Sequence, residues 1–238
     1  MKHLLCIIIA TLTVANAGAE PSKGTMLPLK QVSVSSPVLQ EVIADILVKE
    51  GDTVKENDVL VQLRNDREKL DVEISMKLIE LKRFVARGQK KLFKEKMGSE
   101  EKALEAETDL ELAQLQMKAK QVALDEKTVR SPLGGFVVKT HKERGESVDR
   151  AEKLVDVINI DQVYAQFYLK PELRAAIGEN QAVKVQVPDL ANAAFEGKIS
   201  FIDPSNDAKS GFVRVKVLID NADHRIKAGM NAVAEFGK

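Results

Sequence analysis

The chain is organised around residues 66–127, which read DREKLDVEISMKLIELKRFVARGQKKLFKEKMGSEEKALEAETDLELAQLQMKAKQVALDEK. Apolar residues recur at helical spacing on both sides of Lys96-Met97-Gly98-Ser99. Glycine favours a left-handed helix end, and serine is a good N-cap for the helix that follows. The stretch therefore predicts two long helices that fold back on each other at these four residues.

Both predicted helices carry an apolar stripe with alternating steps of four and three residues, which places it on one helix face. The stripe of the first arm is Ile74, Leu78, Leu81, Val85, Gly88 and Leu92. The stripe of the second arm is Ala103, Ala106, Leu110, Ala113, Met117, Lys120 and Leu124, broken only by the lysine. Folding at the turn sets Leu92 beside Ala103 and Leu78 beside Met117, so we expect the two stripes to form the seam of the hairpin.

Charge supports the same antiparallel arrangement. Residues 82–96 hold seven basic residues and one acidic residue, whereas residues 100–111 hold six acidic residues and one basic residue. A hairpin lays these runs side by side, with acids at the start of the second helix and bases at the end of the first, where the helix dipoles favour them. The alternative is that both runs are simply solvated helix faces.

Composition and the N-terminus bound the function. Of the 238 residues 44% are hydrophobic and 4% aromatic, and the formal charge is zero, so no net field recruits nucleic acid.

Residues 1–19 predict a secretory signal cleaved near residues 17–19, because a polar start precedes a short apolar run and small residues follow it. A retained anchor is the alternative, but it needs about 18 apolar residues. Cys6, the single cysteine, would be removed with the signal.

The segments that flank the hairpin, residues 32–65 and 128–160, repeat one pattern. Two blocks recur 94 residues later: Gly51-Asp52-Thr53-Val54 as Gly145-Glu146-Ser147-Val148, and Leu60-Val61-Gln62-Leu63 as Leu154-Val155-Asp156-Val157. Ser36-Pro37 likewise recurs as Ser131-Pro132. A shared offset predicts an internal repeat, and each copy is too small to bury a core alone. We therefore expect the copies to pair face to face into one sandwich, with the hairpin inserted between them.

Residues 161–238 predict a separate antiparallel domain. Alternating apolar residues mark strands at 163–169, 182–187, 195–202, 213–219 and 232–236, and 171–177 suits a short helix ended by Gly178. Five or six such strands favour a small barrel. Residues 20–31 are polar with two prolines and predict an extended lead-in.

In this order along the chain, these features resemble the periplasmic adaptor subunits of bacterial tripartite efflux and secretion systems, the HlyD-like and RND-associated membrane fusion proteins. The split repeat, with Ser131-Pro132-Leu133-Gly134-Gly135 in its second half, looks like the lipoyl-like domain of that family. Phe195-Glu196-Gly197-Lys198-Ile199 and Ala228-Gly229-Met230 look like its barrel signatures. The resemblance implies a mainly β fold: a split lipoyl-like (barrel-sandwich) domain with an inserted antiparallel coiled-coil hairpin, followed by a small antiparallel β-barrel.

The resemblance also implies a function. Such an adaptor links an inner-membrane transporter, RND or alternatively ABC, to an outer-membrane channel, and it self-associates into a ring or funnel in the periplasm, held at the inner membrane through the transporter. Leu92 and Ser99 match the leucine-to-serine spacing of the family's hairpin tip, and Arg87 lies one residue further from Leu92 than that pattern has it. With Lys94, these residues are the predicted channel contacts. Because residue 238 follows the last predicted strand directly, a further membrane-proximal domain is not expected, which leaves the transporter class open.

The second arm has another stripe, on a face that the seam does not use. Its members are Thr108, Leu112, Leu115, Ala119 and Val122. A merely solvated hairpin would not need this stripe, so we predict that it contacts a neighbouring subunit. The alternative is that it packs on its own domain near the base of the hairpin.

The residues do not indicate catalysis, a cofactor or a metal site. A lipoyl carrier needs an exposed lysine in the turn between its halves, and helices replace that turn here, so Lys69 and Lys127 are not expected to carry a group. His141 and His224 lack metal-ligand spacing and are expected at the surface. No nucleophile–base pair or phosphate loop is recognisable. A lipoyl- or biotin-type carrier subunit and a coiled-coil periplasmic scaffold without a transport role remain the alternatives.

Overall fold

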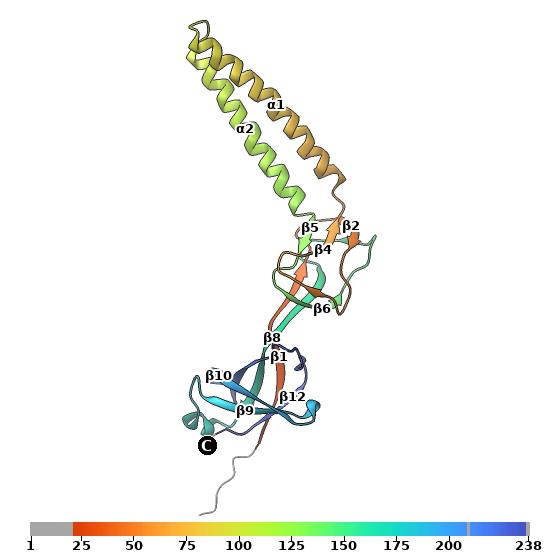
Figure 1. The fold of residues 1–238 in the computed structure, drawn as a ribbon, viewed down its shortest axis with the longest axis vertical. Helices are drawn as coiled ribbons and strands as arrows, with labels where there is room; N and C mark the ends of the chain where they lie inside the picture. Colours follow the sequence, from red (N-terminus) through yellow and green to blue (C-terminus); the bar gives the residue numbers. More distant parts are fainter. Residues whose placement is uncertain (1–20, 209, 237–238) are drawn as a thin grey trace, which may run out of the picture. The chain divides into compact units, whose positions relative to one another are not determined.

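The computed structural model describes residues 21–208 and 210–236, which form two compact units. One unit contains the described residues of 1–27 and 162–238, and the other contains residues 28–161. Figure 1 traces the elements of both units along the chain. The predicted signal, residues 1–19, lies outside the described residues.

The strands that flank the hairpin confirm the internal repeat. The first half contains β2 (Glu41–Ile46), β3 (Thr53–Val54) and β4 (Val59–Leu63), and the second contains β5 (Thr128–Arg130), β6 (Gly135–Thr140), β7 (Ser147–Val148) and the start of β8 (Lys153–Leu169). β6, β7 and β8 begin 94 residues after β2, β3 and β4 respectively. The halves exchange strands, because β2 pairs with β7 and β3 pairs with β6, so they share one core.

The two Ser-Pro pairs fasten the halves to each other. They are 95 residues apart rather than 94, so this block lies one residue off the main offset. The buried Ser36 donates its backbone N–H to the carbonyl of Glu152 at 2.9 Å, and the buried Ser131 donates its own to the carbonyl of Asp58 at 2.8 Å. Each Ser-Pro pair thus satisfies a backbone carbonyl in a neighbouring turn of the shared sandwich.

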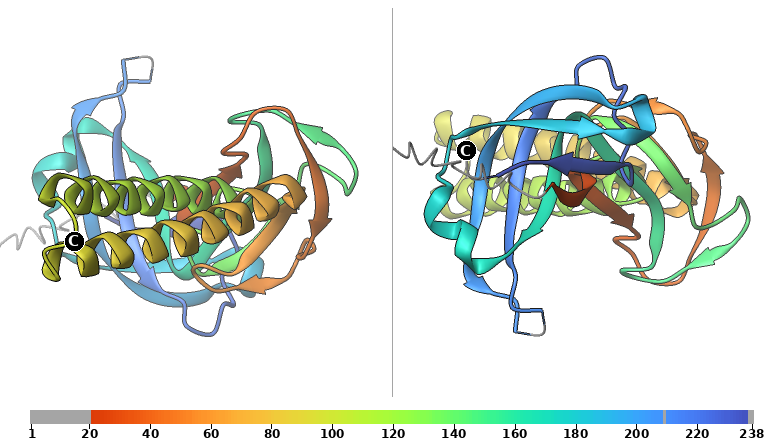
Figure 2. Two further views of the ribbon diagram at one scale, coloured as in Figure 1. Left: turned by 90° about the horizontal axis from the view of Figure 1, so that it is seen from above. Right: turned by 90° about the horizontal axis from the view of Figure 1, so that it is seen from below.

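The hairpin consists of α1 (Asp66–Lys94) and α2 (Glu100–Asp125), which lie side by side in both views of Figure 2. Ser99 caps α2, since its hydroxyl accepts the N–H of Lys102 at 3.3 Å. The left-handed residue of the turn is Lys96, with φ 58°, and not Gly98 as predicted. Gly98 instead allows the turn to pass close to the end of α1, because a Cβ at this position would lie 3.1 Å from Cβ of Leu92.

The seam matches the prediction on α2 but not on α1. Ala106 and Ala113 of α2 are buried, and the rest of the predicted stripe is half-buried except for Lys120, which is exposed. On α1 the buried residues are Val72, Ile79 and Ala86, so the seam lies one residue further along the helix than predicted.

The buried face of α1 contains a lysine that forms an ion pair with α2. A search for apolar residues at helical spacing does not identify such a face. Lys82 of α1 lies half-buried between Ile79 and Ala86, and its ammonium contacts the carboxylate of Asp109 at 2.5 Å. The face that contains this lysine packs on the alanines of α2, and the predicted stripe of larger side chains turns outward: Ile74 is 66% and Leu81 is 58% exposed.

The charged arms also meet as predicted. Besides Lys82–Asp109, Lys90 of α1 contacts Glu107 of α2 at 3.0 Å, and Lys120 of α2 contacts Asp71 of α1 at 3.0 Å. The basic run of the first arm therefore lies against the acidic run of the second, which confirms the antiparallel reading of the charges.

Gly88 provides a test of the corrected seam. Outside the backbone of its own helix, no heavy atom of the described residues would lie within 4 Å of a Cβ at this position. Gly88→Ala should therefore raise the free energy of unfolding of the hairpin by about 0.5–1 kcal/mol through helix propensity. Thermal melting followed by far-UV circular dichroism measures this change. If Gly88 lay in the seam, as the sequence pattern predicted, the same change would lower the melting temperature instead.

The second unit is the predicted small antiparallel barrel. Its strands are β9 (Ala182–Val187), β10 (Ala193–Asn206), β11 (Val213–Asp220), β12 (Asn231–Ala234) and parts of β1 (Ser22–Ser35) and β8, in the order β1-β12-β9-β10-β11-β8 with a closing β1–β8 pairing. The predicted helix is a 3₁₀ helix, η1 (Pro171–Ala176), and a shorter one, η2 (Pro188–Leu190), precedes β10. The expected lead-in is a strand of the barrel, since Ser22–Thr25 pair with β12.

Candidate assembly surfaces

The predicted channel contacts lie around the turn of the hairpin. Arg87, Lys94 and Ser99 are exposed, and Leu92 is at the border of exposure. The hydroxyl of Ser99 is occupied by the cap of α2. The prediction omitted two exposed apolar side chains at this end, which are Phe93 and Met97. Phe93 lies just before the turn region and Met97 lies within it. Large apolar residues at a predicted turn are usually exposed, and this signal could have identified both.

The stripe predicted for subunit contact is solvent-exposed along its whole length on α2. Leu112 is 52% and Leu115 is 64% exposed, and the remaining members are also exposed. Leu104, one turn before Thr108, extends the stripe toward the tip. Exposure of Val122 argues against the alternative that the stripe packs on its own domain. We refer to Leu104, Thr108, Leu112, Leu115, Ala119 and Val122 as the α2 stripe.

A second exposed stripe lies on α1, and the sequence did not identify it as a surface. Its members, the α1 stripe, are Leu70, Ile74, Leu78, Leu81, Val85 and Leu92. Five of these were assigned to the seam because they show the same helical spacing. The hairpin therefore exposes apolar side chains in two stripes, one on each helix.

A buried lysine joins the base of the hairpin to the strands below it. Lys127 follows α2, and its ammonium forms ion pairs with Glu41 of β2 and, at 3.1 Å, with Glu68 of α1. Only 10% of the Lys127 side chain is exposed. A lysine held in this way cannot present its amine as a swinging arm, which argues against the carrier alternative.

Glu41 and Lys127 each stabilise the charged form of the other. Burial raises the pKa of Glu41, but the hydrogen bond from Lys127 and the nearby positive charges outweigh burial and hold that pKa below its usual value. Burial lowers the pKa of Lys127, and its hydrogen bonds to Glu41 and Glu68 outweigh this and raise it. Glu41 and Lys127 are therefore both charged at neutral pH.

His141 is less exposed than predicted. Its Nε2 lies 2.8 Å from a carboxylate oxygen of Asp156, and both side chains are largely buried. Burial raises the pKa of Asp156, but hydrogen bonds from Ser33 and His141 hold it below its usual value. His141 was expected at the surface because it follows a predicted turn. The partner that covers it, Asp156, lies on β8 and could not be identified from that turn. Within residues 21–208 and 210–236, no three His, Cys, Asp or Glu side chains are grouped to hold a metal ion.

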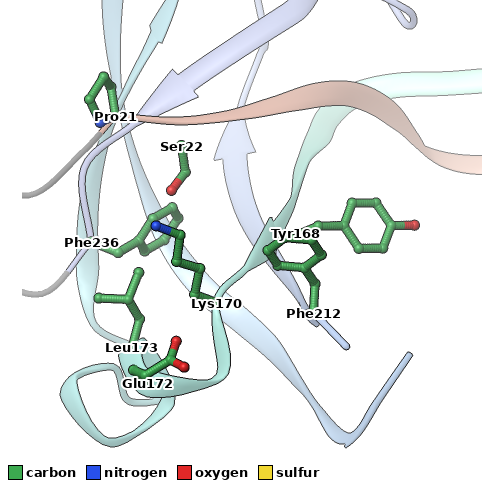
Figure 3. A pocket seen from close by; sticks show the side chains of 8 residues that line it. All are labelled: Pro21, Ser22, Tyr168, Lys170, Glu172, Leu173, Phe212 and Phe236. Atoms are coloured by element: carbon green, nitrogen blue, oxygen red, sulfur yellow. The ribbon is translucent and has the colours of Figure 1, made fainter. Parts of the chain in front are cut away.

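The barrel unit has a pocket of about 620 Å³ at the end of β8, shown in Figure 3. Its lining combines aromatic, aliphatic and charged side chains: Pro21, Ser22, Tyr168, Lys170, Glu172, Leu173, Phe212 and Phe236. Phe236 also packs edge-on against Phe167, with ring centroids 5.1 Å apart. The pocket thus places one lysine and one glutamate beside aromatic rings.

Among the helices that the structure describes, none is both long enough and apolar enough to cross a membrane. The two long helices are α1 and α2, and each alternates apolar residues with many charges.

The sequence is similar to one protein family and to several characterised proteins. Residues 166–238 match the protein family described as "CusB-like, beta-barrel domain". Nodulation protein NolF of Rhizobium meliloti is 23% identical over 227 residues, which cover 90% of this chain and 62% of NolF. The multidrug/solvent efflux pump periplasmic linker protein MepA of Pseudomonas putida is 24% identical over 229 residues, which cover 86% of this chain and 60% of MepA. The chain thus spans less than two thirds of either relative.

A solved structure shares the fold. A MacA-MexA chimeric protein that contains the α-hairpin domain of Pseudomonas aeruginosa MexA superposes with a TM-score of 0.82 at 16% identity, covering 91% of this chain and 80% of the chimera. The fold predicted from the sequence is therefore confirmed. The chain therefore has the fold of this chimera, and its residues 166–238 match the CusB-like β-barrel domain.

Proposed function

We propose that the protein is a non-enzymatic periplasmic adaptor of a tripartite efflux or secretion system. After export and removal of residues 1–19, it would link an inner-membrane transporter to an outer-membrane channel and stay at the inner membrane through the transporter. The observation that carries the proposal is the hairpin, which exposes an apolar stripe on each helix and an apolar tip at Phe93 and Met97. These surfaces need partners, and an assembly of adaptor, channel and transporter supplies them.

The barrel favours an RND transporter over an ABC transporter as the inner-membrane partner. The family description that matches this unit is CusB-like, of the RND barrel type. MepA, by its name, is the periplasmic linker of an efflux pump. Photo-crosslinking from exposed barrel positions such as Tyr168, followed by identification of the captured membrane protein, tests the transporter class.

A deletion strain tests the proposal as a whole. Loss of the gene should increase susceptibility to at least one drug, solvent or metal ion, and the wild-type chain should restore resistance. A strain whose susceptibility to all three classes is unchanged, with no channel crosslinked to cysteines at Leu92 or Ser99, would contradict an adaptor function and favour a scaffold without a transport role.

The α2 stripe should control assembly without controlling folding. Replacing Leu112 and Leu115 with Glu puts two charges into the proposed contact, and self-association should weaken by about tenfold or more. Because both side chains are exposed, the melting temperature should stay nearly unchanged. Sedimentation velocity measures association, and circular dichroism measures melting.

A matched control comes from the other face of the same helix. Leu110→Glu introduces one charge into the half-buried seam and should lower the melting temperature clearly. If the Leu112→Glu, Leu115→Glu double variant unfolds as readily as Leu110→Glu, then the α2 stripe belongs to the core and the proposed contact is wrong.

A further inference from the structure

The pocket at the end of β8 has the size and lining of a small-molecule site. Its volume of about 620 Å³ lies within the range of ligand pockets, roughly 300–1,000 Å³, whose walls are mostly apolar with a few polar groups. In Figure 3 the ring of Phe236 lies on one side of Lys170, and the rings of Tyr168 and Phe212 lie on the other. All eight lining residues belong to the barrel unit, so the pocket does not depend on how the two units are placed.

Hydrogen bonds outside the pocket hold its walls in place. The N–H of Asp207 donates to the carbonyl of Phe212 at 2.9 Å, which fixes Phe212 just before β11. Arg174 of η1 donates from Nη2 to the carbonyl of Pro204 at 3.1 Å, which ties η1 to β10. A ligand that enters a pocket with walls already in place does not have to order them, so less of its binding free energy is lost.

The aromatic rings of the lining favour a ligand that is both apolar and positively charged. Tyr168 is 51% and Phe212 is 36% exposed, whereas Phe236 is buried and packs on Phe167. The face of an aromatic ring carries partial negative charge, so it attracts a cation as well as an apolar group. An apolar anion would gain the contact with the rings but not this electrostatic attraction.

The charged groups of the lining favour a cation as well. Glu172 is exposed, and among the residues that the structure describes its carboxylate has no hydrogen bond or ion pair. Lys170 already has an interaction of its own, and in Figure 3 its ammonium points toward Ser22 and away from Glu172. Arg214, which lines an adjoining pocket of about 370 Å³, is paired with Asp203 at 2.9 Å. The charge that a ligand can still match is therefore the negative charge of Glu172.

From these observations we propose that the barrel unit binds an amphipathic organic cation in this pocket. The apolar body of the ligand lies among Tyr168, Phe212 and Phe236, and its positive charge lies at the carboxylate of Glu172. This binding goes beyond the adaptor function proposed above, which needs only protein partners. In an efflux assembly it would hold a compound of this class on the adaptor itself.

Tetraphenylphosphonium and tetraphenylborate test the proposal, because these two ions carry the same four phenyl groups and opposite charges. Isothermal titration calorimetry on the protein purified from the periplasm should show at least about tenfold tighter binding of the phosphonium ion, because only the cation gains from the aromatic faces and from Glu172. Equal or tighter binding of the borate ion would overturn the assigned charge. Absence of binding of both ions would overturn the site.

Two variants with matched controls locate the binding. Glu172→Gln removes the charge at nearly constant shape, and Phe212→Ala removes a partly exposed ring; each should weaken phosphonium binding by about fivefold or more and leave the melting temperature nearly unchanged. Glu179→Gln changes an exposed glutamate outside the lining, and Phe84→Ala removes a ring that is 77% exposed on α1, so both should bind as the wild type does.

The pattern across these four variants decides the site. Phosphonium binding that is unchanged in both Glu172→Gln and Phe212→Ala, or that is weakened as much by Phe84→Ala as by Phe212→Ala, would place the ion elsewhere on the chain. Either result contradicts the proposed pocket.

The adaptor function is tested separately in cells. Binding of the two ions is measured on the purified chain and needs no transporter, whereas complementation of the deletion strain depends on transport. If the wild-type chain restores resistance and the purified chain binds neither ion, the pocket proposal is wrong and the adaptor function stands. If the phosphonium ion binds as expected and the wild-type chain does not restore resistance, the pocket stands and the transport role fails.

Discussion

Replacing Lys127 with methionine is expected to lower the free energy of unfolding of the unit that carries the hairpin by about 2–4 kcal/mol. The ammonium of Lys127 is held by Glu41 and Glu68, and all three side chains are largely buried. Methionine keeps the length of the side chain but removes the charge, which leaves two carboxylates facing each other with little water. Urea denaturation followed by far-UV circular dichroism of α1 and α2 measures the loss.

The effect of Lys127→Met should depend on pH in a defined direction. In the wild type the pKa of Glu41 is held below its usual 4.5, so the stabilisation from this pairing is present above pH 4.5 and is lost as the pH falls through the lowered pKa. In the variant, Glu41 loses the hydrogen bond and the charge of Lys127 but keeps the hydrogen bond from Val42 and the nearby charge of Arg64, so burial is offset less and protonation of Glu41 relieves the repulsion. The difference in stability between wild type and variant should therefore be largest near pH 7 and shrink as the pH falls, first as Glu41 of the variant is protonated and then as the wild type loses its ion pair below pH 4.5.

Lys120→Met is the matched control. Lys120 also pairs with a carboxylate across the hairpin, that of Asp71, but its side chain is half exposed. Solvent screens such a pair, and its loss should cost at most about 0.5 kcal/mol. If the two methionine variants lose equal stability, burial of Lys127 does not strengthen its ion pairs and the explanation above fails.

Gly135→Ala is expected to be the most damaging single methyl group in the sandwich, with a loss of about 3 kcal/mol or more. A Cβ at this position would lie 2.0 Å from the carbonyl oxygen of Ile158, which belongs to the backbone of β8 and cannot rotate away. The strands β6 and β8 pair at this point, with Phe136 opposite Ile158. Relief of the clash must separate the two strands, so the melting temperature of the unit should fall steeply.

The neighbouring glycine provides the control. A Cβ on Gly134 would lie 3.6 Å from the carbonyl oxygen of Val54, which is an ordinary contact distance. Gly134→Ala should therefore change the melting temperature only slightly. Similar losses for Gly134→Ala and Gly135→Ala would show that the strand pairing, and not the approach of one carbonyl, sets the tolerance of this turn.

Most of the fold could be predicted because the chain contains an internal repeat and because turn and cap residues mark the ends of its strands and helices. Gly51 and Gly145, the repeated turn glycines, have φ of 94° and 90°, a backbone region that glycine enters at low cost. The strand pattern of the barrel and the cap at Ser99 are likewise local features. The join between the units was less visible, since β8 continues without a break from the repeat into the barrel.

The candidate site was predictable in part. The α2 stripe was identified because the alanines that form the seam and the leucines that face outward occupy separate faces of one helix. The α1 stripe was missed because spacing shows that residues share a face but not which face is buried. Larger apolar side chains were assigned to the seam, and the structure places Val72, Ile79 and Ala86 there instead.

By itself, the sequence determined the split repeat, the inserted antiparallel hairpin, the barrel and the outward stripe of the second helix. These follow from turn residues, periodicity and charge order, which are local properties of the chain. Only the tertiary structure decided which face of α1 is buried, that Lys127 is enclosed by Glu41 and Glu68, and that the N-terminal strand completes the barrel. Each of these depends on which surfaces meet, because burial of a stripe or a charge is settled by the partner that covers it.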